Sequence, residues 1–173
     1  LQFRVQRIRK ANDQDGMVIG DFVKAAPEDP QEMYDYIFGV ASALKDEELR
    51  ALALRILTEN RERLLYYPAA SKNHHAQLGG LLYHTKRMLM TGQRVCEVYT
   101  NLNPDLVLIG VILHDMEKLN EIEADVDGIA SGYSFEGQML GHLIQGVKTV
   151  DRLCREMGIS EEKAVMLEHM IYQ

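Results

Sequence analysis

The residues of this chain that could carry chemistry are its histidines and one adjacent aspartate. All six histidines lie between residues 74 and 169, and none lies in the first 73 residues. Four of them fall in different segments with helical periodicity, namely His84, His114, His142 and His169. Asp115 directly follows His114 near the end of the most apolar segment. Because burying an ionised carboxylate is costly unless a cation compensates it, the pair predicts a metal site.

Each of these residues also has a purely structural interpretation. A histidine on an apolar helix face is often a satisfied core residue, which applies most to His142 and His169 when each is taken alone. A single His-Asp dipeptide can arise by chance. His74 and His75 fall in an irregular stretch, where they could contact a substrate phosphate or donate a proton, and a solvated loop pair is an equal alternative. The combination, rather than any one residue, favours a functional site.

Helical periodicity covers most of the chain after residue 29. The predicted helices begin at Pro30, run over residues 46–65, 78–99 and 104–113, run from Ser134 toward Met157, and begin again at Ser160. Asp29 before Pro30 and Asn103 before Pro104 are typical N-terminal caps. An acidic run between these helices is predicted to be a solvated turn, with a small hairpin closed at Asp127-Gly128; its members are Glu121, Glu123, Asp125 and Asp127.

The N-terminal region differs from the rest in pattern and charge. Residues 1–10 alternate apolar with basic or polar side chains, which predicts an exposed strand, and residues 17–23 predict a second extended segment. The whole chain has a net charge of −7, yet residues 1–10 hold four cations and no acid; these are Arg4, Arg7, Arg9 and Lys10. We therefore expect any nucleic-acid contact to favour the N-terminal end.

Two motifs resemble the HD superfamily of metal-dependent phosphohydrolases. They are LGGLLYHT at residues 78–85 and ILHDMEK at residues 112–118. YPAA at residues 67–70, NHH at residues 73–75 and GHL at residues 141–143 are more specifically similar to the bacterial 3′-to-5′ exoribonucleases that join an OB-fold to an HD domain. The resemblance runs through most of the chain.

The resemblance implies a role for each matching residue. It implies that His84, His114 and Asp115 are ligands of one ion, and it places His142 at a second ion and His169 on the metal side. Asp115 and Lys118 would serve catalysis, with the lysine holding a phosphate oxygen as a point charge. Arg87 lies close to His84 and could approach the substrate. For Lys118 and Arg87, an ordinary surface cation is an equal or better interpretation.

The superfamily usually completes its first metal site with an aspartate on a later helix. No such residue follows His169, and the chain stops at Gln173 inside a helical pattern. We expect the domain to be truncated at its C-terminus, with the remaining ligand beyond Gln173.

Mixed imidazole and carboxylate ligands suit manganese, iron, nickel or zinc better than magnesium. One or two such ions would lower the pKa of a bound water and neutralise charge on phosphoryl oxygens, so no protein nucleophile is needed. No Walker A loop, G-x-S-x-G elbow or H-E-x-x-H helix supports another chemistry.

The sequence thus predicts an all-α, HD-domain helical bundle with a short N-terminal β remnant of an OB-like domain. We expect the OB-like remnant and linker over 1–26, a helical segment over 27–66 and the HD-type domain over 67–173. The predicted function is 3′-to-5′ hydrolysis of single-stranded RNA in the cytoplasm, without a membrane span. A nucleotidase or cyclic-nucleotide phosphodiesterase, and a non-enzymatic helical regulatory module, remain alternatives. The oligomeric state is left open.

Overall fold

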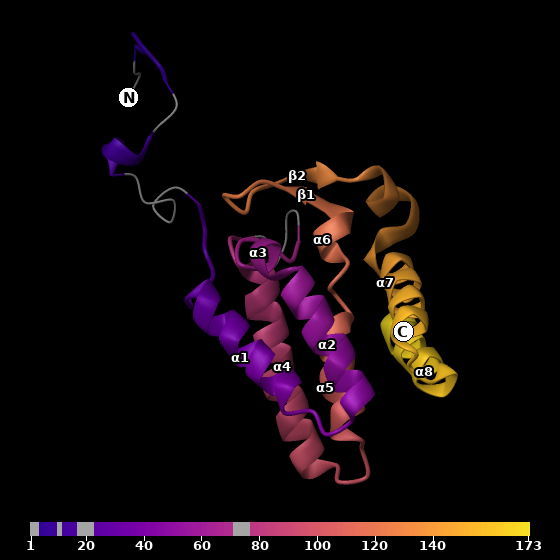
Figure 1. Ribbon diagram of the computed structural model, residues 1–173. Helices are drawn as coiled ribbons and strands as arrows, with labels where there is room; N and C mark the ends of the chain where they lie inside the picture. The colour runs from indigo at the N-terminus through magenta and orange to yellow at the C-terminus, as the bar shows by residue number, and fades with distance from the viewer. Residues whose placement is uncertain (1–3, 10–11, 17–22, 71–76) are drawn as a thin grey trace.

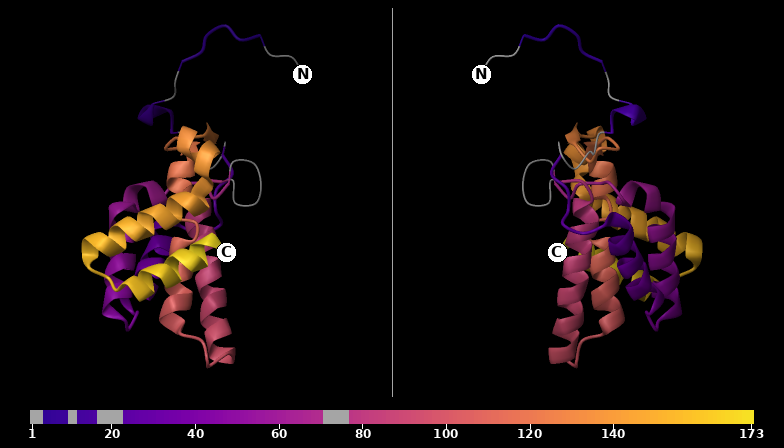
Figure 2. Two further views of the ribbon diagram at one scale, coloured as in Figure 1. Left: turned by 90° about the vertical axis from the view of Figure 1, so that its right-hand side faces the viewer. Right: turned by 90° about the vertical axis from the view of Figure 1, so that its left-hand side faces the viewer.

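The chain is mostly helical, as the sequence predicts, with one small two-stranded sheet. The computed structural model describes residues 4–9, 12–16, 23–70 and 77–173. Figures 1 and 2 show α1, α2, α4 and α5 packed as one bundle, with α7 and α8 paired beside it. Among the described residues, no helix is both long and apolar enough to cross a membrane.

The predicted helix starts are confirmed. The helices are η1 (Asp13–Asp15), α1 (Pro30–Ser42), α2 (Glu47–Glu59), α3 (Arg61–Leu64), α4 (Gly80–Val98), α5 (Pro104–Leu113), α6 (Lys118–Glu121), α7 (Phe135–Met157) and α8 (Glu161–Tyr172). The Asp29 carboxylate accepts the Glu32 N–H at 3.0 Å, and Asn103 Oδ1 accepts the Asp105 N–H at 3.0 Å. These bonds satisfy backbone donors that have no partner inside the helix.

Two predicted helices are interrupted. The segment predicted as one helix over 46–65 breaks at Asn60, whose side chain donates back to the Ile56 carbonyl at 2.9 Å. Within α7, Gly141 has φ 67° and ψ 168°, a backbone conformation that favours glycine. The helix therefore restarts at His142, so the direction of the His142 side chain does not follow from the turns that precede Gly141.

The predicted hairpin is confirmed. Strands β1 (Ile122–Ala124) and β2 (Ala130–Tyr133) pair antiparallel. Asp125 Oδ1 accepts the N–H groups of Asp127 and Ile129 at 3.1 and 3.2 Å, which shapes the turn. The hairpin is continuous with α6 on one side and leads into α7 on the other.

The strand expected at residues 1–10 is not found where the structure describes it. Residues 4–9 are exposed and belong to no strand. An extended segment without a neighbouring strand leaves its backbone groups to water, so local alternation alone does not make a strand. The second extended segment, predicted over 17–23, falls almost wholly outside the described residues, and the OB-like remnant stays a prediction.

Helix α5 is the centre of the core. It packs against α1, α2, α4 and α8. Ile109, Ile112 and Leu113 are at most 2 % exposed, and each fully buried side chain of this size stabilises the fold by about 1.5–3 kcal/mol. The end of α5, which carries the His-Asp pair, is thus held by four neighbouring helices.

We predict that Gly137→Ala destabilises the protein by about 1–3 kcal/mol through overpacking. A Cβ at this position would lie 2.4 Å from the Glu121 carbonyl oxygen, so α6 and α7 would have to separate. Gly39→Ala is the matched control, because a Cβ there meets nothing within 4 Å and alanine favours a helix interior by about 1 kcal/mol. Chemical denaturation measures both. Equal stability of the two variants would contradict the prediction.

Candidate metal centre

Helix α4 and the end of α5 bring two imidazoles and one carboxylate together. His84 Nε2 and His114 Nε2 lie 3.2 Å apart. Asp115 Oδ2 lies 3.3 Å from His84 Nε2 and 3.4 Å from His114 Nε2. The three residues predicted as ligands of one ion therefore converge on a common point.

These separations fit the donor set of a single first-row ion. With bonds of about 2.1 Å, two ligand atoms lie roughly 3.0 Å apart in octahedral and roughly 3.4 Å apart in tetrahedral coordination. The observed values of 3.2–3.4 Å fall within that range. Helices α4 and α5 run side by side (Figure 1), and the ligands belong to α4 and to the end of α5. The geometry is that of a candidate His/Asp metal site.

A backbone contact fixes the tautomer of His114. Its Nδ1 lies 2.7 Å from the Val111 carbonyl oxygen. A carbonyl only accepts, so Nδ1 carries the proton and donates it. With a metal ion bound, Nε2 would be unprotonated and its lone pair would face the point on which the three ligand atoms converge, which is the arrangement that metal-ligating histidines generally have.

His142 approaches the opposite oxygen of the same carboxylate. Its Nε2 lies 3.4 Å from Asp115 Oδ1, whereas His84 and His114 face Oδ2. Glu121 holds His142 from behind, accepting its ring Nδ1–H at 2.9 Å and its backbone N–H at 3.2 Å. Asp115 thus has imidazole nitrogens on both sides, an arrangement with which one carboxylate can join two ions.

Glu121 was not foreseen as part of the site. Its side chain is only 14 % exposed, so the prediction of a solvated acidic run is wrong for this member. Glu123 and Asp125 are exposed, as predicted. The only signal in the sequence was the position of Glu121 at the end of a helical turn close to the His-Asp motif, and its pairing with His142 needs the tertiary fold.

Asp115 is ionised despite its burial. The residue is 5 % exposed, and burial alone would raise its pKa. Hydrogen bonds and charge from His114 and Lys118 outweigh burial and hold the pKa of Asp115 well below its ordinary value. Burial lowers the pKa of His114, but the hydrogen bond and the charge of Asp115 raise it by more. The pKa of His114 is therefore above its usual value. Lys118 Nζ lies 2.7 Å from Asp115 Oδ2.

The comparison with protein families matches residues 81–172 to the HD domain. This stretch contains His84, His114, Asp115 and His142, and it is more than half of the chain. The chain belongs to the HD-domain family.

A relative gives a more specific similarity. The chain is 33 % identical over 171 residues to a protein of Geobacillus sp. (strain WCH70) named 3′-5′ exoribonuclease YhaM, and the match covers 99 % of this chain and 52 % of the relative. The chain therefore spans about half the length of that relative. No solved structure matched.

The other residues predicted for the site make no described bond to the cluster of His84, His114, Asp115 and His142, or lie outside the described residues. Arg87 is exposed on α4, one turn beyond His84. His169 is exposed on α8, and no bond within the described part of the chain joins it to the cluster. His74 and His75 lie outside the described residues. The roles of these four residues stay predictions.

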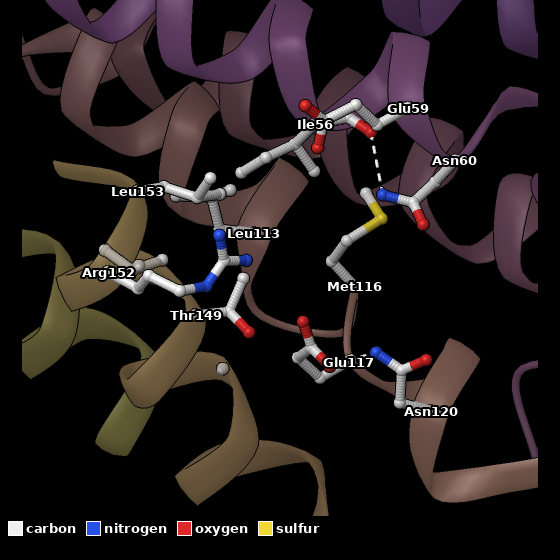
Figure 3. A pocket seen from close by; sticks show the side chains of 12 residues that line it. Ile56, Glu59, Asn60, Leu113, Met116, Glu117, Asn120, Thr149, Arg152 and Leu153 are labelled. Carbon is white, nitrogen blue, oxygen red and sulfur yellow. Dashed lines mark hydrogen bonds between the residues drawn. The ribbon is translucent and has the colours of Figure 1, made fainter. Parts of the chain in front are cut away.

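A cavity of about 300 Å³ lies beside the candidate metal ligands, and none of them lines it. Glu117 and Asn120 form part of its wall and Thr149 and Arg152 of α7 another part, as Figure 3 shows. Glu117 is 8 % exposed, and its Oε2 accepts the Asn120 side-chain amide at 2.6 Å. None of the clustered histidines lines this cavity.

We predict that Asp115→Asn weakens Mn²⁺ binding by more than about a hundredfold, because the loss of an anionic ligand exceeds the 10- to 100-fold effect typical of outer partners. The helices should stay folded, since the change is nearly isosteric. Calorimetric titration and circular dichroism measure both properties. Asp151→Asn is the control, because Asp151 lies on α7 and, among the described residues, its carboxylate pairs with Arg155 and not with the histidines. Unchanged Mn²⁺ affinity in Asp115→Asn would refute the ligand assignment.

Proposed function

We propose that this HD-domain chain hydrolyses phosphodiester bonds with a metal-activated water, and that its substrate is single-stranded RNA shortened from the 3′ end. The observation that carries the proposal is the convergence of three imidazoles on both oxygens of buried Asp115. The name of the 33 % identical relative supports the choice of RNA. Free thiols at Cys96 and Cys154 agree with a cytoplasmic location.

In this proposal His84, His114 and Asp115 hold one divalent transition-metal ion, and His142 serves a second. Such an ion supplies Lewis-acid activation of water and neutralises charge on the phosphoryl group. The donor set admits manganese, iron, nickel or zinc. The imidazoles of His84, His114 and His142 are 27, 28 and 24 % exposed, so the cluster has an open side from which a phosphodiester can approach.

Lys118 is the cation best placed to meet the substrate. Its ammonium lies 2.7 Å from Asp115 Oδ2, and its side chain is 19 % exposed. When another cation holds the carboxylate, the ammonium can turn to a phosphate oxygen on the open side. Lys118 then binds and orients the phosphate, and no step requires it to lose a proton.

Product analysis tests the proposal. The chain is incubated with Mn²⁺ and 5′-labelled single-stranded RNA, and separately with free and cyclic nucleotides. A ladder of products shortened from the 3′ end, with release of mononucleotides, is expected. Turnover of small nucleotides alone would favour a nucleotidase or cyclic-nucleotide phosphodiesterase. Absence of turnover together with absence of metal binding would favour a non-enzymatic module.

We predict that Arg4→Glu with Arg7→Glu weakens binding to single-stranded RNA and lowers its salt dependence. Both residues are exposed in an otherwise acidic chain, and each lost phosphate contact reduces the logarithmic salt slope by about 0.7. Arg9 is left intact because it pairs with Asp15 at 2.6 Å. Fluorescence anisotropy at several KCl concentrations measures the slope.

The control for this experiment reverses two other exposed arginines. Arg94 on α4 and Arg155 on α7 have side chains 79 and 80 % exposed. Reversing the charge of both changes the net charge of the chain as much as the N-terminal double variant does. If both double variants lose the same affinity, the N-terminal segment has no special part in RNA binding. Hydrolysis of a small chromogenic phosphodiester should not change in either variant.

A further inference from the structure

Helix α6 is a single turn of four residues that carries two side chains of the candidate site. Lys118 at its start contacts Asp115, and Glu121 at its end contacts His142. A helix of this length does not stabilise itself in water. The placement of both side chains must therefore come from contacts that α6 makes with other parts of the fold.

Arg63 of α3 supplies one such contact. Its guanidinium donates to the Leu119 carbonyl, to Asn120 Oδ1 at 3.0 Å and to the Tyr67 hydroxyl at 3.3 Å. It also lies over the Tyr67 ring, 5.0 Å from the centroid. One side chain thus binds two consecutive residues of α6. A guanidinium suits this because its donors are fixed in one plane.

Tyr67 binds the chain just beyond α6. It is 3 % exposed, and its hydroxyl donates to the Ile122 carbonyl at 2.5 Å. The carbonyls of Leu119 and Ile122 lie on either side of Glu121, at the helix end where carbonyls lack intrahelical partners. Arg63 and Tyr67 together form a clamp, which we call the α6 clamp, on the backbone that carries Glu121.

The α6 clamp also extends toward the other flank of α6. Asn120 accepts from Arg63 through Oδ1 and donates from Nδ2 to Glu117 Oε2 at 2.6 Å. Glu117 is two residues beyond Asp115. The chain of bonds therefore runs from α3 to both ends of the turn, without Arg63 or Tyr67 touching the histidines or Asp115 in the described contacts.

We propose that Arg63 and Tyr67 are positioning residues, which hold α6 so that Glu121 orients His142 and Lys118 faces Asp115. The inference rests on the proposed function only in assigning His142 to metal binding. Loosening the clamp leaves Glu121 free to move away from His142, whose ring then loses its fixed tautomer and direction. Outer partners of metal ligands typically affect metal affinity by 10- to 100-fold.

Mn²⁺ titration of the full chain tests this with two pairs of variants. Tyr67→Phe and Arg63→Met should weaken Mn²⁺ binding by about tenfold, the lower end of the outer-partner range, and should lower kcat more than they change KM. Tyr34→Phe is matched to Tyr67→Phe, because Tyr34 is also buried and donates to a carbonyl, that of Leu57, at 3.1 Å. Arg61→Met is matched to Arg63→Met, because Arg61 also lies on α3 over a tyrosine ring and bonds Gln31.

The controls separate positioning from general destabilisation. In thermal unfolding, Tyr34→Phe should lose about as much stability as Tyr67→Phe. Arg61→Met should lose no more than Arg63→Met, because Arg61 is exposed and has one described hydrogen bond. Mn²⁺ affinity of both controls should stay at the wild-type value. If the controls weaken Mn²⁺ binding as much as the clamp variants do, or if neither set does, the α6 clamp has no positioning role. Tyr67→Phe removes a single oxygen, so it keeps the test valid even where Arg63→Met fails to fold.

A double-mutant cycle tests whether the clamp acts through Glu121. Glu121→Gln alone should weaken Mn²⁺ binding, and adding Tyr67→Phe to it should cause little further loss. Independent, additive losses would overturn the proposed route. Failure of the wild-type chain to bind Mn²⁺ would contradict the proposed function itself, whereas wild-type binding with an unaffected Tyr67→Phe variant would contradict only the clamp.

Discussion

The candidate site depends on one constraint, which is that the buried Asp115 carboxylate must be compensated. At 5 % exposure, an ionised carboxylate without partners would be strongly destabilising. Cations and imidazoles from three helical elements meet this requirement: His84 from α4, Lys118 from α6 and His142 from α7. These contacts use both oxygens of the Asp115 carboxylate. The positions of α4, α6 and α7 relative to one another therefore depend on this one side chain.

The elements that meet this constraint are themselves fixed in different ways. Helix α5 is held by packing against four other helices, with Ile109, Ile112 and Leu113 buried. The second half of α7 begins at His142, directly after the Gly141 kink, so the His142 N–H lies at a helix N-terminus and has no partner one turn back. The Glu121 carboxylate accepts that N–H as well as the ring Nδ1. Its negative charge is also favourable at a helix N-terminus. One carboxylate therefore orients both the helix and the imidazole.

Local patterns allowed much of this fold to be predicted from the sequence. The caps at Asp29 and Asn103, the nearly all-apolar segment of α5 and the Asp127-Gly128 turn depend on neighbours within a few residues, and each is confirmed. The HD family also follows from short motifs. The interruption at Asn60 and the kink at Gly141 were not predicted, because a polar or glycine residue inside a helical pattern can equally be tolerated.

The remaining differences come from tertiary contacts. Glu121 belongs to a segment whose acidic composition is typical of a solvated turn. Its side chain is mostly buried because α7 packs against it at Gly137 and His142. The helix that carries His169 was predicted correctly, but the direction of the His169 side chain could not be predicted from the sequence. Met170 packs at Gly110 and Ile171 at Gly146, where the absence of side chains lets α8 come close. Since this face of α8 is taken by apolar residues, His169 is turned outward, and its spacing in the sequence could not distinguish the two faces.

The charges around Asp115 also fit the phosphodiester substrate of the proposed function. In the protein alone, Lys118 and the imidazoles offset Asp115, and Glu121 is paired with His142. Under the proposed function, each divalent ion adds two positive charges to a group already close to neutral, so the loaded site attracts an anion on its open side. A phosphodiester is such an anion, and its phosphoryl oxygens gain further negative charge during attack by water. The same excess of positive charge therefore favours both binding of the substrate and stabilisation of the transition state, and it does so without a nucleophilic side chain.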